Sequence, residues 1–441
     1  MDRRAFVKSI LAMPIAGAAV PAVGEEIGQA SSVPCDGARH PTTGKPLPVW
    51  KSGEFQVHFI YTGVGESMFW IMPDGTTMLL DCGDHPAINR GKKALWVLPN
   101  GNRHAGEWVA RYVTRVNPAK TDVDYMMISH HHADHAGMEG WGAGTREWKG
   151  QTLSVSGFLQ AADALKFKRG FDRGWPDFND PIPDERCDAK CYAHVRKTIA
   201  YLMERDGLRM EKFRVGAINQ VAMLRNPAPY ADFRVTNIAG NGKILCRDGS
   251  VRDLYAEKHG AKKLNENGLS LGLLVQYGPF RFYTAGDFSD RIRLPDKSVR
   301  SIEVELAKEI DPVDVAKVNH HGHHSMYPGL VKALKARVWT NCSLDQQHCT
   351  DDTMCRLADR SLYAGDRLML PTYMPLNRPQ LPVGRGYLPD VARCVIDQPC
   401  HVVLDVPPGG ETYTFSCFSA TKADNPLMGE FTFRSDEDLV A

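Results

Sequence analysis

The chain has 441 residues, of which 43% are hydrophobic and 24% are charged, and its formal net charge is +1. These proportions are ordinary for a globular protein, and the length accommodates one large α/β domain or about two or three average domains. A chain without a large positive excess has no bulk electrostatic attraction for a polyanion. We therefore expect no long nucleic acid as a partner.

The first 30 residues have the pattern of an export signal rather than of a folded element. The pair Arg3-Arg4 precedes a run of small apolar residues at 9–23, which resembles a twin-arginine signal, although Asp2 stands where serine or threonine is usual. A small-residue cleavage site follows near Ala22. We predict a periplasmic mature protein without a stable membrane span, and an uncleaved N-terminal anchor is the alternative.

After the signal, residues 31–54 are rich in proline, glycine and serine and predict an irregular lead-in. From residue 55 the hydrophobic spacing alternates between the strand and helix periods. It predicts strands at 55–61, 67–72, 76–80 and 123–128, with a helix at 107–116. These elements open a domain that we place at 55–345.

Residues 150–235 differ in character and predict a helical insertion, with helices at 161–168 and 193–205. Between these helices, residues 171–178 form an aromatic and acidic loop that we expect to wall the site. Trp175 offers a stacking surface, and Asp172 or Asp177 a partner for a cationic group. Simple packing against the outside of the domain is the alternative.

The remaining elements return to strand character. The spacing predicts strands at 233–238, 271–277, 280–285 and 315–318, and a helix at 328–335. We place a C-terminal extension at 346–441. Its segments 401–406 and 412–416 flank a Pro-Pro-Gly-Gly turn and predict a β-hairpin.

A histidine cluster directly follows the predicted buried strand at 123–128. It has the spacing His-x-His-x-Asp-His, formed by His130, His132, Asp134 and His135. Two imidazoles at positions i and i+2 can reach one cation, and the following aspartate and histidine can reach a second. Imidazole with carboxylate suits Zn²⁺, and also Mn²⁺ or Fe²⁺. A solvated histidine-rich loop is the alternative, which the strand context disfavours.

Two further strand ends carry candidate ligands. Asp287 ends the strand at 280–285, where its carboxylate can bridge two metals. His320 and His321 follow the strand at 315–318. We expect at least one of these two histidines to bind metal, and the other to bind substrate or to orient a ligand. His323, together with its neighbour, is either a proton donor or an exposed loop histidine.

A carboxylate also ends the strand at 76–80. Asp81 is placed to accept a hydrogen bond from a ligand imidazole and so to fix its orientation. A plain turn-capping aspartate is the competing interpretation.

Together these motifs resemble the metallo-β-lactamase superfamily, and within it the branch typified by the soluble domain of the competence protein ComEC. The resemblance covers most of residues 55–345. It rests on the segments Tyr61–Ser67, Pro73–Gly83, Ser270–Asp287 and His320–Gly322, in addition to the first histidine motif. It implies an α/β fold, an αββα sandwich, with two divalent metal ions at one edge of the packed sheets. The expected metal ligands are His130, His132, Asp134, His135, Asp287, His320 and His321.

Two departures from the family pattern affect the site. Tyr61 stands in place of an expected aspartate. Many superfamily members supply another histidine ligand between the first motif and the later aspartate. Here only His194 and His259 lie in that interval, neither at a convincing strand end, whereas Asn241 follows a strand. We expect the first metal to lack one protein ligand and to be completed by water.

The resemblance implies hydrolysis by a metal-activated hydroxide, with a phosphodiester or related small-molecule ester as the leading substrate class. We expect Asp134, Asp287 and His321 to take part directly, the aspartates by holding the metals and orienting the hydroxide. A histidine of the loop at 320–324, or a metal-bound water, would protonate the leaving group. One alternative is a mononuclear iron oxygenase acting on persulfides. The other is a non-catalytic metal-binding envelope protein.

The chain contains 11 cysteines, many for a cytosolic enzyme but plausible for an exported one. None falls in a Cys-x-x-Cys zinc pattern, and the odd number leaves at least one thiol unpaired. Sequence spacing does not fix connectivity. Three pairs are close enough in sequence to bond: Cys187 with Cys191, Cys349 with Cys355, and Cys394 with Cys400.

Overall fold

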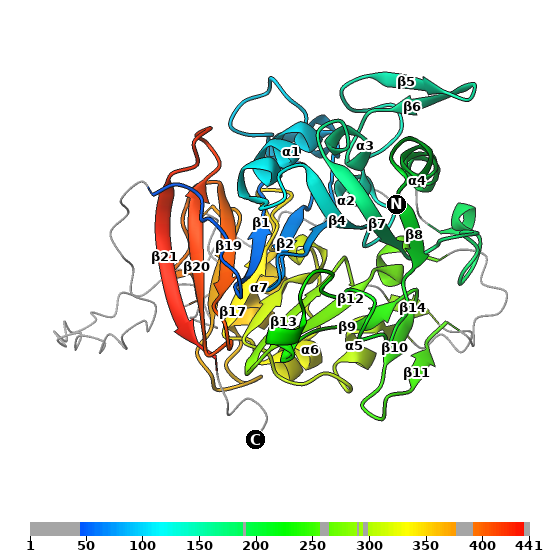
Figure 1. Ribbon diagram of the computed structural model, residues 1–441. Helices are drawn as coiled ribbons and strands as arrows, with labels where there is room; N and C mark the ends of the chain where they lie inside the picture. The colour runs from blue at the N-terminus through cyan, green and yellow to red at the C-terminus, as the bar shows by residue number, and fades with distance from the viewer. Residues whose placement is uncertain are drawn as a thin grey trace, which may run out of the picture. The chain divides into compact units, whose positions relative to one another are not determined.

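The computed structural model describes residues 45–187, 191–255, 264–288, 291–293, 299–375 and 391–435. It is a mixed α/β structure with two large β-sheets and two small ones (Figure 1). The predicted export signal and residues 31–44 of the predicted lead-in lie outside the described residues. Among the helices that the structure describes, none has the length and apolar character needed to cross a membrane.

The larger sheet has nine strands. From one edge to the other these are β21 (Leu427–Arg434), β20 (Thr412–Ser419), β19 (Cys400–Val406), β1 (Phe55–Phe59), β2 (Met68–Ile71), β3 (Thr77–Leu80), β4 (Asp122–Met127), β7 (Lys166–Asp172) and β8 (Arg209–Lys212). Neighbours from β21 to β3 are antiparallel. From β3 to β8 they are parallel, so that β3, β4 and β7 end at the same edge of the sheet.

The second large sheet has eight strands. In order these are β11 (Val251–Asp253), β10 (Lys243–Leu245), β9 (Phe233–Gly240), β12 (Gly272–Tyr277), β13 (Phe280–Ala285), β16 (Val315–Lys317), β17 (Val338–Asn341) and β18 (Leu368–Pro371). Neighbours from β11 to β13 are antiparallel. Those from β13 to β18 are parallel, which brings the ends of β13 and β16 side by side.

The two large sheets pack against each other through aromatic side chains. The ring of Phe59 on β1 lies 6.1 Å from that of Phe282 on β13, and Trp70 on β2 lies 5.9 Å from the same ring. Phe55 and Phe233 make a third such contact at 5.1 Å. Because these side chains are fully or almost fully buried, they form the apolar layer between the sheets.

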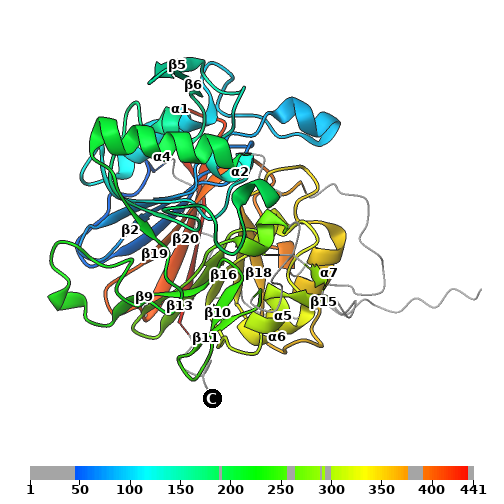
Figure 2. The same ribbon diagram turned by 90° about the vertical axis from the view of Figure 1, so that its right-hand side faces the viewer.

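Helices cover the faces of the sheets that point away from this layer (Figure 2). The helices α1 (Ala105–Val116), α3 (Phe158–Ala161) and α4 (Tyr192–Asp206) share an apolar cluster with the nine-stranded sheet. The helices α5 (Ile302–Leu306), α6 (Pro328–Leu334) and α7 (Asp351–Ala358) share another with the eight-stranded sheet. On α1, the residues that reach the core recur at helical spacing: Val109, Ala110, Val113 and Val116.

The remaining elements are short. The strands are β5 (Thr145–Trp148) with β6 (Gln151–Ser154), and β14 (Arg291–Arg293) with β15 (Val299–Ser301). The α-helix α2 (Ala133–Ala136) follows β4. The 3₁₀ helices are η1 (Ala87–Lys93), η2 (Asp184–Arg186), η3 (Ala228–Tyr230), η5 (Glu266–Leu269) and η6 (Asn319–Gly322).

Most of the predicted elements are confirmed, but the helix predicted at 161–168 is wrong. There α3 ends at Ala161, and β7 begins at Lys166. Phe167 is buried between the exposed Lys166 and Lys168, which is the period-two pattern of a strand. Pairing of β7 with β4 and β8 outweighs the helix-favouring alanine, leucine and lysine composition. Residues 150–235 therefore do not form a helical insertion throughout, because β7 and β8 belong to the nine-stranded sheet.

The C-terminal hairpin is confirmed as the pair β19 and β20, but it is not an appended extension. Strand β19 pairs antiparallel with β1, in a register that sets Val406 opposite Phe55 and Val402 opposite Phe59. Strand β18 likewise joins the eight-stranded sheet. Residues 346–441 thus contribute strands to both large sheets, and β19 covers an edge of β1 that would otherwise be open.

None of the three disulfide pairings that sequence spacing allows is formed. Cys187, Cys355 and Cys400 each carry a thiol that is not in a disulfide, and each of the three pairs contains one of them.

Candidate metal centre

Three loops that follow strands meet at one edge of the two large sheets. The first follows β4 and carries the His-x-His-x-Asp-His motif. The second follows β13 and carries Asp287, and the third is η6 after β16, which carries His320 and His321. Because β13 and β16 are parallel neighbours, their ends present side chains to the same space.

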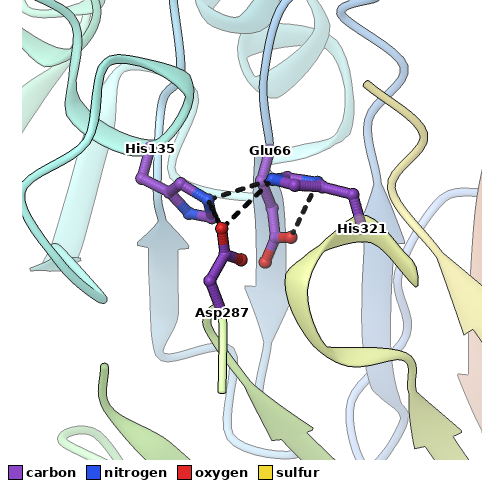
Figure 3. A group of neighbouring side chains, drawn as sticks. All are labelled: Glu66, His135, Asp287 and His321. Atoms are coloured by element: carbon purple, nitrogen blue, oxygen red, sulfur yellow. Dashed lines mark hydrogen bonds and ion pairs between the residues drawn. The ribbon is translucent and has the colours of Figure 1, made fainter. Parts of the chain in front are cut away.

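Four buried side chains form one of two potential ligand groups: Glu66, His135, Asp287 and His321. The Nε2 atoms of His135 and His321 lie 3.1 Å apart, and the Oδ2 atom of Asp287 lies 3.2 Å from the former and 3.6 Å from the latter. Asp134 places its Oδ2 atom 3.5 Å from Nε2 of His321. Figure 3 shows His135, Asp287 and His321 pointing at one another from separate segments. We call this group the second site, because it contains His135, the last histidine of the first motif.

The hydrogen bonds behind these rings fix which nitrogen faces the second site. Nδ1 of His135 donates to the Asp81 carboxylate at 2.7 Å, and Nδ1 of His321 donates to the backbone oxygen of Cys342 at 2.8 Å. Since both partners only accept, each neutral ring directs the Nε2 lone pair into the site. Two lone pairs and a carboxylate oxygen at about 3 Å repel one another unless a cation lies between them.

The spacing also has the size that a metal ion requires. Ligand atoms about 2.0–2.1 Å from a tetrahedral Zn²⁺ are separated from one another by about 3.3 Å. The separations among His135, His321 and Asp287 run from 3.1 to 3.6 Å, and Asp134 lies 3.5 Å from His321. The donor set and its dimensions therefore fit a divalent metal such as Zn²⁺.

The other potential ligand group, which we call the first site, consists of His130, His132 and Asp287. Nε2 of His130 lies 3.1 Å from Nδ1 of His132 and 3.6 Å from Oδ2 of Asp287. The Ser129 hydroxyl donates to Asp81 at 2.6 Å and lies 3.1 Å from Nδ1 of His130, so it accepts from that nitrogen. Asp81 thus orients His135 directly and His130 through Ser129.

No further histidine joins the first site among the described residues. His194 lies on α4 and belongs to neither ligand group, and His259 lies outside the described residues. Asn241 donates its side-chain amide to the backbone oxygen of Arg173 at 2.8 Å. Asp287 is therefore shared between a group with His130 and His132 and a group with His135, His321 and Glu66, and Asp134 lies beside the latter group.

The electrostatics of the centre favour a positive charge at its middle. Burial alone would raise the pKa of Asp287, but His135 and His321 beside it hold the pKa well below its ordinary value. The pKa of Asp134 is likewise held well below normal, against burial, by the hydrogen bond to His321. Burial would lower the pKa of His135, but Asp287 and Asp81 hold it well above normal. A metal ion and a proton therefore compete for this position.

His320 lies at the edge of the centre rather than in it. Its Nε2 atom is 3.9 Å from Oδ2 of Asp287, it is within hydrogen-bond distance of the Asn267 amide nitrogen at 3.2 Å, and its side chain is 22% exposed. The sequence did not show which of His320 and His321 is the ligand. In the structure, His321 belongs to a potential ligand group and His320 does not.

The loop that carries both histidines has an unusual backbone. His320 and His321 have φ angles of 50° and 51°, and Gly322 follows at 78°. Side-chain-bearing residues in this left-handed region are costly and cluster at functional sites. Gly322 has a second constraint, because a Cβ atom there would lie 2.2 Å from Sγ of Cys349.

Sequence reasoning did not assign a role to Glu66, which belongs to the potential ligand group of the second site. Its carboxylate is 3.7 Å from Nδ1 of His321 (Figure 3) and 2.9 Å from Nζ of Lys317. The charged side chains of Glu66 and Lys317 are both fully buried. The signal available in the sequence was a glutamate directly after the segment Gly63-Val64-Gly65, between two apolar strands. A charge in such a position is buried only when it has a partner.

The loop at 171–178 does not offer Asp172 to a ligand. That carboxylate is fully buried, 2.7 Å from Nε2 of His131, and accepts hydrogen bonds from the backbone of Gly174 and Trp175. Trp175 packs against the apolar cluster beneath α4 and contacts Phe178. The loop therefore has a packing role at these two residues.

A cavity of about 1080 Å³ adjoins the centre. The rings of His323 and His348 line it, and they contact those of His320 and His321 at 5.1 and 6.0 Å. Its remaining wall combines apolar surface, including Pro375, with polar groups. The polar groups include Lys93, Gln346, Gln347, Tyr373 and the carboxylates of Asp345, Asp351 and Asp352. The volume suits a small molecule.

In comparisons with known proteins, no family model matches the chain, and no curated protein matches it. The structure shows buried clusters of histidine, glutamate and aspartate that can bind metal.

Proposed function

We propose that this chain is a metal-dependent hydrolase of the metallo-β-lactamase superfamily, with two divalent ions bound in the first and second sites. The observation that carries the proposal is the pair of Nε2 atoms on His135 and His321, which face each other at 3.1 Å beside the Asp287 carboxylate. Zn²⁺ is the leading candidate on donor chemistry, and Mn²⁺ or Fe²⁺ share the same ligand preferences.

The order of the layers supports the assignment of fold. Helices, a nine-stranded sheet, an eight-stranded sheet and helices again form a mixed α/β structure that is compatible with an αββα sandwich. In both sheets an antiparallel half is followed by a parallel half, and all the candidate ligands follow strands of the parallel region or its border. This is the arrangement that the resemblance of the motifs implies.

In the proposed reaction, a divalent ion supplies Lewis acidity and an activated water at neutral pH. Asp287 and Asp134 stay ionised and hold positive charge at the centre. Asp81 and the Cys342 carbonyl keep the rings of His135 and His321 in the tautomer that directs Nε2 inward. His320, which lies at the mouth, is positioned to contact the substrate oxygen or the leaving group.

The substrate that we propose is a small phosphodiester or related ester. The adjoining cavity has room for a small molecule, and its wall of imidazole, amide and carboxylate groups suits a polar leaving group better than an acyl chain. Its carboxylates, together with the near-neutral net charge, argue against a polyanionic substrate.

The experiment is a hydrolysis screen of the metal-loaded and chelator-treated protein on bis-p-nitrophenyl phosphate, nitrocefin and a lactone panel. We expect metal-dependent hydrolysis of the diester that Asp134→Asn lowers at least 100-fold. Asp163→Asn is the matched control, because Asp163 forms exposed ion pairs away from the centre. Activity confined to lactams or lactones would replace the substrate class, and a chain that retains no divalent metal would overturn the proposal.

Export belongs to the same proposal and rests on the Arg3-Arg4 pattern. Fusion of residues 1–30 to a reporter that is active only in the periplasm after folded export provides the test. Substitution of both arginines by lysine should abolish export, and unchanged export would contradict this route.

A further inference from the structure

Five charged side chains are buried together behind the loop that carries the first site. They are His131, Asp172, Arg173, Asp184 and Glu266, each at most 1% exposed. Arg173 binds Glu266 through two bonds of 2.6 Å, and its Nη2 atom also binds Asp184 at 3.0 Å. His131 lies 2.7 Å from the Asp172 carboxylate. We call this set the His131 cluster.

The His131 cluster holds the backbone between two candidate ligands. His131 stands between His130 and His132, and its backbone N–H donates to the Glu266 carboxylate at 2.8 Å. Its side chain is tied to Asp172 at the end of β7. With backbone and ring both fixed, the chain direction on either side of residue 131 is fixed too. This determines where the His130 and His132 rings point.

The composition of the cluster is difficult to explain by stability alone. Removing several charges from water is costly, and apolar residues of similar volume often stabilise a core as well or better. Buried ionic groups are retained where a unique arrangement matters, as in networks in which every member has a partner. Here the arrangement that the cluster specifies is the loop of the first site.

The second site has a different buried ion pair beneath it. Lys317 on β16 and Glu66 are both fully buried and lie 2.9 Å apart. The Glu66 carboxylate is 3.7 Å from Nδ1 of His321. The backbone N–H of Glu66 donates to the backbone oxygen of Asp134 at 2.7 Å. This pair therefore touches the chain at two of the ligands of the second site.

We infer that the two metal sites are positioned by separate buried ionic clusters, so that each site can be weakened without the other. Glu266 and Arg173 are positioning residues for the first site, and Glu66 and Lys317 for the second. The inference rests on the proposed binuclear centre. It goes further by assigning three residues outside the potential ligand groups, together with Glu66 of the second site, to one site or the other.

The test is a metal titration of the full chain, stripped with a chelator and followed by calorimetry with Zn²⁺ and by absorption with Co²⁺. The wild type should bind two ions, the tighter at the second site, which has more protein ligands. Glu266→Gln should weaken the looser site about 10- to 100-fold and change its Co²⁺ bands only. Glu66→Gln should do the same to the tighter site.

Two further variants keep the result interpretable. Asp124→Asn removes a buried carboxylate at the opposite end of β4, where it pairs with Arg225 and Lys168, and should leave both sites unchanged. Arg173→Lys keeps the charge but loses the bidentate bond to Glu266. It should weaken the looser site by an intermediate amount, and it serves in place of Glu266→Gln if that variant does not fold.

The outcomes separate this inference from the proposed function. A wild type that binds no divalent ion overturns both. A wild type that binds two ions, with variants that weaken both sites equally or neither, overturns only the separate positioning of the sites. Loss confined to the looser site in Glu266→Gln and to the tighter site in Glu66→Gln supports it.

Discussion

The Asp81 carboxylate accepts a hydrogen bond from Nδ1 of His135 at 2.7 Å and so fixes the tautomer of that ring. The same carboxylate accepts from the backbone and hydroxyl of Ser129 at 2.7 and 2.6 Å. One aspartate directly after β3 therefore orients histidines of both sites.

Asp81→Asn should lower metal affinity about 10- to 100-fold, the usual cost of losing a partner behind a ligand histidine. The asparagine amide can accept hydrogen bonds only through its one oxygen. Its NH₂ group would face N–H and O–H donors that now point at the second carboxylate oxygen. Competition with a fluorescent zinc chelator measures the change. Asp74→Asn is the control, because Asp74 caps a turn remote from the centre. Equal affinities in wild type and Asp81→Asn would contradict the assigned role.

Removal of metal should lower the stability of the folded chain. A ligand at 100 times its dissociation constant stabilises the folded state by about 2.7 kcal/mol per site. Thermal unfolding in chelator, followed by addition of Zn²⁺, measures the loss and its recovery. His135→Ala should show a smaller recovery, since it removes a ligand. A melting temperature indifferent to chelator and metal in the wild type would show that the centre holds no ion.

Gly322→Ala should impair both folding and metal binding. The new Cβ atom would lie 2.2 Å from Sγ of Cys349, and the residue has a φ of 78°. Overpacking and strain of this kind each cost about 1–3 kcal/mol, and relief would displace the adjacent His321. Denaturant unfolding and zinc titration give the two readouts. Gly101→Ala is the matched control, because its Cβ meets nothing within 4 Å, and comparable losses there would refute the explanation.

Acid should destabilise the fold through two histidines that lie away from the centre. Burial lowers the pKa of both His58 and His401 to about 3, against 6.5 in the unfolded chain. At pH values between the folded and unfolded pKa, these two histidines therefore bind protons in the unfolded state but not in the folded state. The stability from this source is present above pH 6.5 and is lost as the pH falls from 6.5 towards 3.

The slope of that loss is about 1.4 kcal/mol per pH unit for each histidine, or about 2.7 for the two together. Urea unfolding between pH 4 and 6 in chelator measures it. His58→Gln should make the dependence shallower by the share of one histidine, while retaining a partner for the Tyr112 hydroxyl. Parallel pH profiles for wild type and variant would rule out this source of acid sensitivity.

Local sequence was sufficient to predict the segments that meet at the centre. His130, Asp287 and His321 each follow a short apolar strand, and strand ends of a parallel region share an edge. The prediction needed only the order of strand and motif. It could not choose between His320 and His321, because that choice depends on a left-handed turn of the backbone.

Sequence patterns failed where the deciding partner lies far away in the chain. Lys317 and Glu66 bury opposite charges against each other across 251 positions of sequence (317 − 66), and neither residue signals the other. The prediction of a helix at 161–168, which includes the start of β7, is wrong for a similar reason. Its two neighbours, β4 and β8, supply the pairing that overrides local helix preference at Lys166.

The pairing of β1 with β19 has a consequence for biosynthesis. The first strand of the larger sheet pairs with a strand that begins 341 positions later in the chain (400 − 59), so this sheet is not complete until β19 has been synthesised. A shortened version stopping at residue 345 would retain every candidate ligand, yet would present a bare apolar strand to its neighbours. Such a fragment should accumulate as aggregate, and engineering of this protein has to keep its tail.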